Sequence, residues 1–172
     1  MSNSNTLCRS FKPFVDRRSR VLILGSMPGP EALRKRQYYG FTGNHFWTIL
    51  PALLGEKKTA DYRKKLAMLR RHRVALWDVL ESCTRPGALD SSIRDLTPNK
   101  IPDLVRRYPN IRAIFINGQF AHKIFLKKFA GEITVPVAVL PSTSPANAAM
   151  PVAEKVRRWG ALRKFLYNTA PS

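Results

Sequence analysis

The chain has 172 residues, a length that suits one compact domain. A hydrophobic fraction of 44% provides for a buried core and excludes a disordered chain. Lysine and arginine number 30 against 11 aspartate and glutamate residues, which gives a formal charge of +19. This surplus favours a polyanionic partner, with nucleic acid first and a membrane surface second.

The start of the chain and its cysteines narrow the class of protein further. No apolar run approaches the roughly 20 residues of a membrane-spanning helix, and residues 1–6 lack the apolar stretch of a signal peptide. We therefore expect an intracellular, cytoplasmic protein with no membrane partner. The two cysteines, Cys8 and Cys83, exclude a disulfide scaffold, and the three histidines have neither metalloprotease nor zinc-deaminase spacing. We expect no metal and no other cofactor.

The first half of the chain begins with a polar segment, residues 1–10, for which we expect a flexible arm. Residues 21–24 (V-L-I-L) are all apolar, which is typical of a strand buried on both faces. The G-S-M-P-G-P segment that follows cannot continue a strand. Residues 46–54 and 61–71 have helical patterns, and residues 74–77 are a second candidate strand.

The second half continues the alternation of strands and helices. The patterns predict a short helix over residues 101–108, a strand over 111–116, a helix over 119–129, a strand over 135–140 and a basic amphipathic helix over 151–167. Short apolar strands that alternate with helices indicate an α/β fold with a mostly parallel sheet. No linker or repeat divides the chain, so we expect residues 1–172 to form a single domain.

Polar and aromatic segments follow each predicted strand. In open α/β sheets, ligands bind outside the carboxyl ends of the strands. The segments that meet this condition are residues 25–29 and 37–44 after the first strand, residues 77–78 after the second, residues 117–118 after the third and residues 141–147 after the fourth. We expect them to form one rim.

The residue types on this rim suit the binding of a nucleobase. A base swung out of a duplex is held by stacking on an aromatic face and by hydrogen bonds to its edge. Tyr38 and Tyr39 can stack, and Asn44 and Asn117 each carry both donors and an acceptor. The hydroxyls and backbone amides of residues 142–144 can contact a phosphate.

Each of these features also has a plainer structural interpretation. A Gly/Pro-rich segment after a strand is often only a turn, Asn44 can be a helix cap, and Asn117 before Gly118 can be part of a turn. For Asp78, orienting backbone amides at a helix start is a better interpretation than acting as a base. The evidence for a site is therefore that all of these residue types follow strands at the same edge of the predicted sheet.

Five ordered motifs together resemble the uracil-DNA glycosylase superfamily and, within it, the hypoxanthine-DNA (deoxyinosine) glycosylase family. They are G-S-M-P-G with Q-Y-Y-G-F-T-G-N-H-F-W (residues 25–47), L-W-D-V-L (76–80), C-T-R-P-G-A-L-D (83–90), F-I-N-G (115–118) and L-P-S-T-S-P-A-N-A (140–148). The resemblance implies a three-layer α/β/α sandwich around a four-stranded, mostly parallel sheet. It also implies a monofunctional DNA repair glycosylase that flips a deaminated base, hypoxanthine or uracil, out of DNA and hydrolyses its N-glycosidic bond. We expect a monomer whose partner is DNA.

The resemblance also assigns roles to individual residues. Many relatives carry Asp or Asn at the position of Met27 to hold the attacking water, and in the deoxyinosine family this catalytic role falls to the residue that matches Asn44. Tyr39 matches the aromatic residue that stacks on the extruded base. The remaining residues implied are Ser26, Met27, Pro28 and Asn117 at the base, and Ser142, Thr143, Ser144 and Asn147 at the DNA.

Two other functions stay open at this point. Met27 cannot hold a water molecule, which motivates a non-catalytic basic nucleic-acid-binding protein on the same fold. A nucleotide-binding protein that uses residues 25–29 as a phosphate loop is disfavoured, because the chain lacks both G-x-x-x-x-G-K-[ST] and G-x-G-x-x-G.

Overall fold

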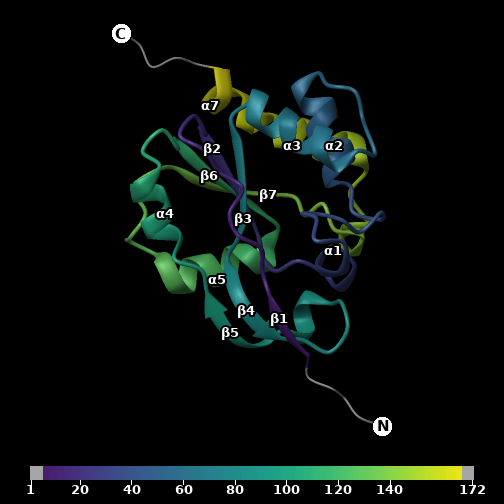
Figure 1. The fold of residues 1–172 in the computed structure, drawn as a ribbon, viewed down its shortest axis with the longest axis vertical. Coiled ribbons are helices and arrows are strands. Elements are labelled where there is room, and N and C mark those ends of the chain that lie inside the picture. The colour runs from purple at the N-terminus through teal and green to yellow at the C-terminus, as the bar shows by residue number, and fades with distance from the viewer. Residues whose placement is uncertain (1–5, 168–172) are drawn as a thin grey trace.

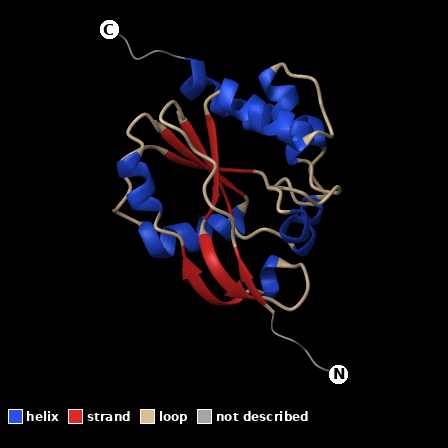
Figure 2. Ribbon diagram, in the orientation of Figure 1, coloured by secondary structure: helices blue, strands red, loops and turns tan. Residues whose placement is uncertain are grey.

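The protein is built around a parallel sheet of four strands, which confirms the predicted α/β class (Figures 1 and 2). The structure is a computed structural model, and it describes residues 6–167. The strands lie in the order β3-β2-β6-β7, and every neighbouring pair is parallel. Their bounds are β2 Val21–Gly25, β3 Val74–Asp78, β6 Ala113–Asn117 and β7 Val137–Leu140.

The two central strands are buried on both faces, as their continuous apolar runs predict. Val21 and Ile23 of β2 face one core, and Leu22 and Leu24 face the other. The first core packs against α2 Phe46–Leu54, α3 Tyr62–Arg71, α6 Val152–Trp159 and α7 Arg163–Tyr167. The second packs against α4 Ile101–Arg107 and α5 Gln119–Phe129. Helices therefore cover both faces of the sheet, in three layers (Figure 1).

Two features of the helices differ from the sequence prediction. The expected helix over residues 151–167 is interrupted by a 3-10 turn over Gly160–Leu162, so that α6 and α7 are separate. A short helix that the pattern did not indicate, α1 Pro30–Lys35, begins with a proline in its first turn. It lies directly after the 25–29 segment, with Gly29 as its N-cap residue.

A second, antiparallel sheet was not predicted. It consists of β1 Leu7–Arg9, β4 Leu80–Thr84 and β5 Arg94–Pro98, in the order β1-β4-β5. The prediction of a flexible arm over residues 1–10 is therefore wrong for residues 7–9, because Cys8 is buried and pairs with Cys83 in this sheet. Residues 1–5 lie outside the described residues.

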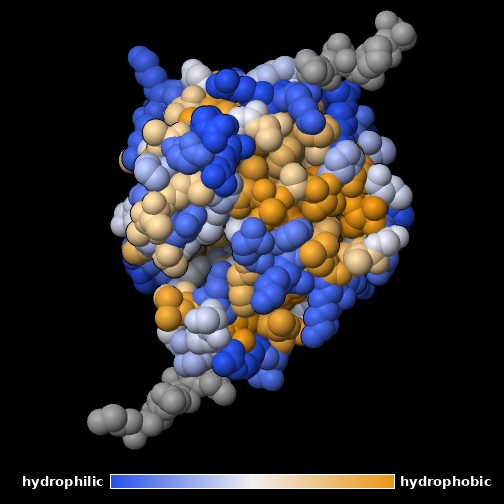
Figure 3. Space-filling view, turned by 180° about the vertical axis from the view of Figure 1, so that it is seen from behind, coloured by the Kyte–Doolittle hydropathy of each residue, from blue (hydrophilic) through white to orange (hydrophobic). Residues whose placement is uncertain are grey.

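The surface is mixed in polarity. Seen from behind, apolar residues gather over the middle and one side of the molecule among hydrophilic ones (Figure 3). Edge strand β7 and helix α5 contribute exposed apolar side chains, with Val137 36% and Leu126 49% exposed. Among residues 6–167, no helix is both long enough and apolar enough to cross a membrane.

Candidate active site

A cleft of about 1280 Å³ opens at the carboxyl ends of the parallel strands. Residues from the ends of all four strands contribute to its lining. All ten residues that the sequence singles out as site residues lie on this one cleft: Ser26, Met27, Pro28, Tyr39, Asn44, Asn117, Ser142, Thr143, Ser144 and Asn147. The rim expected from the strand order is therefore present.

The floor of the cleft is formed where β2 and β3 end side by side. Gly25 pairs with Asp78 in the parallel register. A Cβ atom at Gly25 would lie 2.6 Å from Oδ1 of Asp78 and 3.2 Å from the hydroxyl of Tyr39. Close approach of these two polar groups thus requires glycine here.

The residues after Gly25 are held by polar contacts from another loop. Ser26 donates its hydroxyl to Oδ2 of Asp90 at 3.0 Å, and the carbonyl of Pro28 accepts a hydrogen bond from Arg85 at 2.7 Å. Met27 and Pro28 are buried. This segment therefore presents an apolar wall to the cleft and turns its polar groups toward residues 85–90.

Tyr39 has one ring face covered and its hydroxyl engaged. Its ring stacks on Phe46 with centroids 3.8 Å apart and planes 10° apart, and its hydroxyl accepts a hydrogen bond from Nδ2 of Asn117 at 3.3 Å. Tyr39 also has φ 54°, a left-handed conformation that bulky residues seldom adopt and that is common at functional sites. Burial raises the pKa of Tyr39 above its ordinary value, so its phenol stays protonated at neutral pH.

Asn44 is half-buried and contacts the start of α2. Its Oδ1 accepts a hydrogen bond from the backbone N–H of Phe46 at 2.9 Å. His45, not Asn44, is the N-cap residue of α2, so the interpretation of Asn44 as a helix cap is wrong; its bond to Phe46 uses one lone pair of this oxygen. The second lone pair stays available, and the Nδ2 group donates no hydrogen bond to another described residue.

Asn117 is committed to neighbouring protein groups. Its Nδ2 donates to the hydroxyl of Thr143 at 2.9 Å as well as to Tyr39, and its Oδ1 accepts from the backbone N–H of Thr143 at 3.0 Å. The carbonyl of Thr143 in turn accepts from the N–H of His45 at 2.9 Å. These bonds join the end of β6, the loop over residues 37–45 and the loop over residues 141–147.

Polar side chains also shape the loop over residues 141–147. The hydroxyl oxygen of Ser142 accepts from the N–H of Ser144 at 3.1 Å, and that of Ser144 accepts from the N–H of Ala146 at 3.3 Å. Nδ2 of Asn147 donates to the carbonyl of Ser142 at 3.3 Å. The hydroxyl hydrogens are left free to point at a ligand.

Of the charged residues that line the cleft, Asp78, Arg85 and Asp90 interact with one another, and none of the three was predicted as a site residue. Asp78 was expected at a helix start, but strand β3 is followed by Val79 and strand β4, so that interpretation is wrong. Asp78 is buried, and its Oδ2 has no hydrogen-bond partner among the described residues. Burial, together with the charge of Asp90, raises the pKa of Asp78 to about 7. Arg85, which is also buried, lies 4.0 Å from Asp90 and balances part of this acidic charge.

The parallel register could have indicated Asp78, because it places the last residue of β3 beside Gly25. Arg85 and Asp90 belong to the C-T-R-P-G-A-L-D motif (residues 83–90) of the family resemblance, but no role was predicted for them, because the path of their loop depends on the small antiparallel sheet. Within residues 6–167, no group of three or more His, Cys, Asp or Glu side chains could hold a metal ion.

The layered fold and its ligand cleft define an α/β enzyme that works at the carboxyl edge of a parallel sheet. The chain belongs to the uracil DNA glycosylase superfamily, whose family model matches residues 12–163. It is therefore a DNA glycosylase, a hydrolase of N-glycosyl bonds.

Individual relatives agree with this family. The chain is 39% identical over 142 residues to a hypoxanthine DNA glycosylase of Methanosarcina acetivorans; this match covers 81% of this chain and 87% of the relative. It is also 38% identical over 112 residues to a hypoxanthine DNA glycosylase of Methanosarcina barkeri; this match covers 64% of this chain and 71% of the relative. A solution structure of a Methanosarcina acetivorans protein assigned to the uracil DNA glycosylases superposes with a TM-score of 0.78 at 34% identity, over 92% of this chain and 99% of that one.

Proposed function

We infer that this chain removes hypoxanthine from DNA by hydrolysis of the N-glycosidic bond. The observation that carries the inference is the gathering of the ten predicted residues on one cleft at the carboxyl edge of the sheet. The substrate class is supported by 39% identity to a relative named for hypoxanthine, over 81% of this chain. A cleft of about 1280 Å³ also has room for a purine and part of its sugar-phosphate backbone.

The base enters the cleft after leaving its stack, at a cost of a few kcal/mol that is lowest at mismatched or single-stranded positions. Phe46 supports one face of Tyr39, and the other face is the platform for the base. Met27 and Pro28 line the apolar wall beside it, and Ser26 precedes them in the same segment. Asn117 holds Tyr39 and Thr143 in place, and its Oδ1 retains one lone pair for the base edge.

Asn44 is the residue we assign to the attacking water. An amide does not remove a proton at neutral pH, so Asn44 orients the water through the free lone pair of Oδ1 and through Nδ2. As the C1′–N9 bond breaks, its electron pair goes to the leaving base and the sugar becomes an oxocarbenium-like cation. Water then adds to C1′ and gives up one proton, which balances the charge on the departing hypoxanthine.

The DNA backbone is bound beside the cleft. Ser142, Thr143, Ser144 and Asn147 form the segment that we assign to phosphate contacts, through hydroxyls and backbone amides. The charge of +19 supplies affinity that does not depend on sequence. We expect the protein to act as a monomer, on DNA in the cytoplasm.

The test is a set of duplex and single-stranded oligonucleotides that each carry one hypoxanthine, uracil or xanthine. After single-turnover incubation and alkali, we expect strand scission at hypoxanthine. Asn44→Ala should lower this rate roughly 100-fold or more, the size of effect seen when one transition-state contact is removed, while affinity for the duplex stays within about twofold. The wild-type rate in Asn44→Ala would contradict the assignment of the water.

The family of this chain sets aside the alternative that Met27 motivated, a protein that binds nucleic acid without cleaving it. Such a protein would bind in a salt-dependent way and release no base from any of the oligonucleotides, whereas a glycosylase leaves alkali-labile sites.

A further inference from the structure

Three parallel strands of the sheet are each preceded by an arginine. Arg20 precedes β2, Arg73 precedes β3 and Arg112 precedes β6. The strand register sets Val21 beside both Val74 and Ala113, so the three arginines lie next to one another. Backbone hydrogen bonds fix this arrangement, because the N–H of Arg20 donates to the carbonyl of Arg73 at 2.8 Å and the N–H of Arg112 to that of Arg20 at 2.7 Å.

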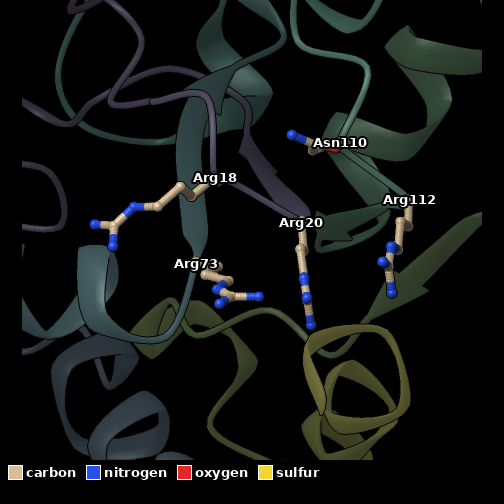
Figure 4. Close-up of a pocket in the computed structure, with 5 residues that line it drawn as sticks. All are labelled: Arg18, Arg20, Arg73, Asn110 and Arg112. Atoms are coloured by element: carbon tan, nitrogen blue, oxygen red, sulfur yellow. The ribbon is translucent and has the colours of Figure 1, made fainter. Parts of the chain in front are cut away.

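These arginines line a small cavity of about 190 Å³ together with Arg18 and Asn110. Figure 4 shows the side chains of Arg20 and Arg73 directed toward the same space, with Arg112 beside them and Arg18 extending outward. We call these four arginines the arginine edge. The cavity is too small for a nucleoside and large enough for one or two phosphate groups.

Three of the four arginines of the arginine edge lack a carboxylate partner within residues 6–167. None of Arg18, Arg20 and Arg73 forms an ion pair with a carboxylate among the described residues, whereas Arg157 and Arg158 share Glu154. Burial and the neighbouring charges of Arg73 and Arg112 lower the pKa of Arg20. Clustered like charges of this kind gain most from a bound anion, and arginine forks match phosphate oxygens.

The backbone of Arg73 supports a function for its side chain. Arg73 has φ 61° between α3 and β3, where glycine or asparagine is the usual residue. A left-handed φ is sterically unfavourable for arginine. In this conformation Arg73 lines the cavity at the edge of the sheet.

The arginine edge and the cleft lie at opposite ends of the sheet. A strand of five residues separates them by roughly 16 Å along β2. When the cleft holds a base, the DNA that carries this base lies at one end of the sheet and the arginine edge lies at the other end.

We propose that the arginine edge is a second phosphate-binding site, which contacts the backbone of a second nucleic acid segment while the cleft holds the first. The phosphate chemistry stands on the cavity and its charges alone. The two-segment arrangement rests on the proposed function of the cleft. Such a protein would pass from one DNA segment to the next without full release, which assists a search for rare lesions.

The variant to compare is Arg73→Gln with Arg112→Gln, and its matched control is Lys127→Gln with Lys128→Gln. Both lose two positive charges, but Lys127 and Lys128 are exposed on α5, outside both sites. Arg20 is left intact because it donates to the carbonyl of Leu166 at 2.7 Å. Arg18→Gln is a milder single variant at an exposed position, so a loss of fold in the double variant does not end the test.

Capture of a second duplex is the first measurement. Protein is placed on an immobilised duplex that carries an abasic-site analogue, and retention of a labelled second duplex is followed against salt. We expect the arginine-edge double variant to reduce the slope of log K against log salt by about 2, and Arg18→Gln by about 1. The lysine control should still capture the second duplex. Its affinity should fall less than that of the arginine-edge variant, because its two lost charges lie outside both sites. Equal capture by the two double variants would overturn the two-segment proposal.

Two further measurements distinguish free phosphate from nucleic acid as the ligand of the arginine edge, and distinguish this site from the cleft. Inorganic phosphate or pyrophosphate, at constant ionic strength against chloride, should raise the unfolding temperature of the lysine control and not that of the arginine-edge variant. Stabilisation without duplex capture would assign the site to free phosphate compounds, and no difference in either assay would refute a phosphate site. Base release from a hypoxanthine duplex should be unchanged in the arginine-edge variant. If the rate of base release falls together with capture of the second duplex, the arginines contact the first duplex and the proposal fails. If the wild-type protein captures a second duplex but releases no hypoxanthine, only the proposed function is overturned.

Discussion

At the scale of single residues, Gly25 shows why a glycine stands at the end of β2. The polar groups of Asp78 and Tyr39 approach it so closely that a side chain has no room. Gly25→Ala should therefore displace the Asp78 carboxyl or the Tyr39 ring and lower the single-turnover rate of base release by an order of magnitude or more, about 10-fold for each 1.4 kcal/mol of lost alignment.

The same segment provides the control for this prediction. A Cβ atom at Gly29 would meet nothing within 4 Å, and the φ of this residue is −69°. Gly29→Ala should keep most of the activity. Equal rates in the two variants would show that the close contacts at Gly25 have no part in shaping the cleft.

Asp78 makes a second prediction at this scale, on the dependence of stability on pH. Its pKa is about 7 in the folded protein, against 3.8 for an ordinary aspartate, so the native state holds a proton that the unfolded state has released between these values. Stability is therefore lost as pH rises from about 4 to about 7, by up to about 1.4 kcal/mol for each pH unit. Below this window the contribution of the group is fully favourable.

Asp78→Asn removes this titration. Relative to the wild type, the variant should gain unfolding free energy as pH rises through the window, as measured by urea unfolding at pH 5, 6, 7 and 8. The difference between the proteins cancels the other titrating groups. A constant difference across these pH values would mean that the carboxyl titrates normally.

At the scale of elements, the main sheet could be predicted because its strands are short, apolar and buried on both faces. A run such as V-L-I-L that ends in a Gly/Pro segment is typical of such a strand, and the alternation with helices orders the strands in parallel. The parallel arrangement then brought the predicted loops to one edge, including Asn44 and Asn117. The tertiary register was not needed to find the cleft.

The second sheet could not be predicted from the same patterns. Strand β5 is exposed along most of its length and its sequence is polar, while β1 has only three residues. Pairing between β1 and β4 joins residues more than seventy positions apart, which no local pattern reports. The loop carrying Arg85 and Asp90 depends on this sheet, so its sequence was noted as a motif but its place on the cleft was not predicted. Likewise, the amphipathic pattern over residues 151–167 gave no sign of the turn at Gly160.

Asn117 connects β6 to two loops, so its replacement tests how these elements stabilise one another. Asn117→Ala removes its hydrogen bonds to Thr143 and Tyr39 and leaves a buried threonine hydroxyl with a lost partner. We expect a loss of about 2–3 kcal/mol in unfolding free energy and faster hydrogen exchange at the N–H of Thr143. Asn110→Ala, which removes one bond from an exposed side chain to the carbonyl of Arg17, should change stability much less. If both variants lose the same stability, Asn117 does not couple the loops.

At the scale of the whole molecule, the charge of +19 and the cleft perform separable tasks. Phosphate contacts release counterions, so affinity for duplex DNA should fall linearly on a log–log plot against salt, with a slope of about −0.9 for each phosphate neutralised. The bond-breaking step takes place inside the cleft, among groups that salt screens weakly. With enzyme in excess and saturating, the rate of hypoxanthine release should therefore stay within about twofold while the affinity falls by orders of magnitude. Asn44→Ala should show the wild-type slope with the lowered rate, because its amide contacts no phosphate. A rate at saturation that falls in parallel with affinity would show instead that surface charge takes part in the chemical step, and the division between binding surface and cleft would have to be given up.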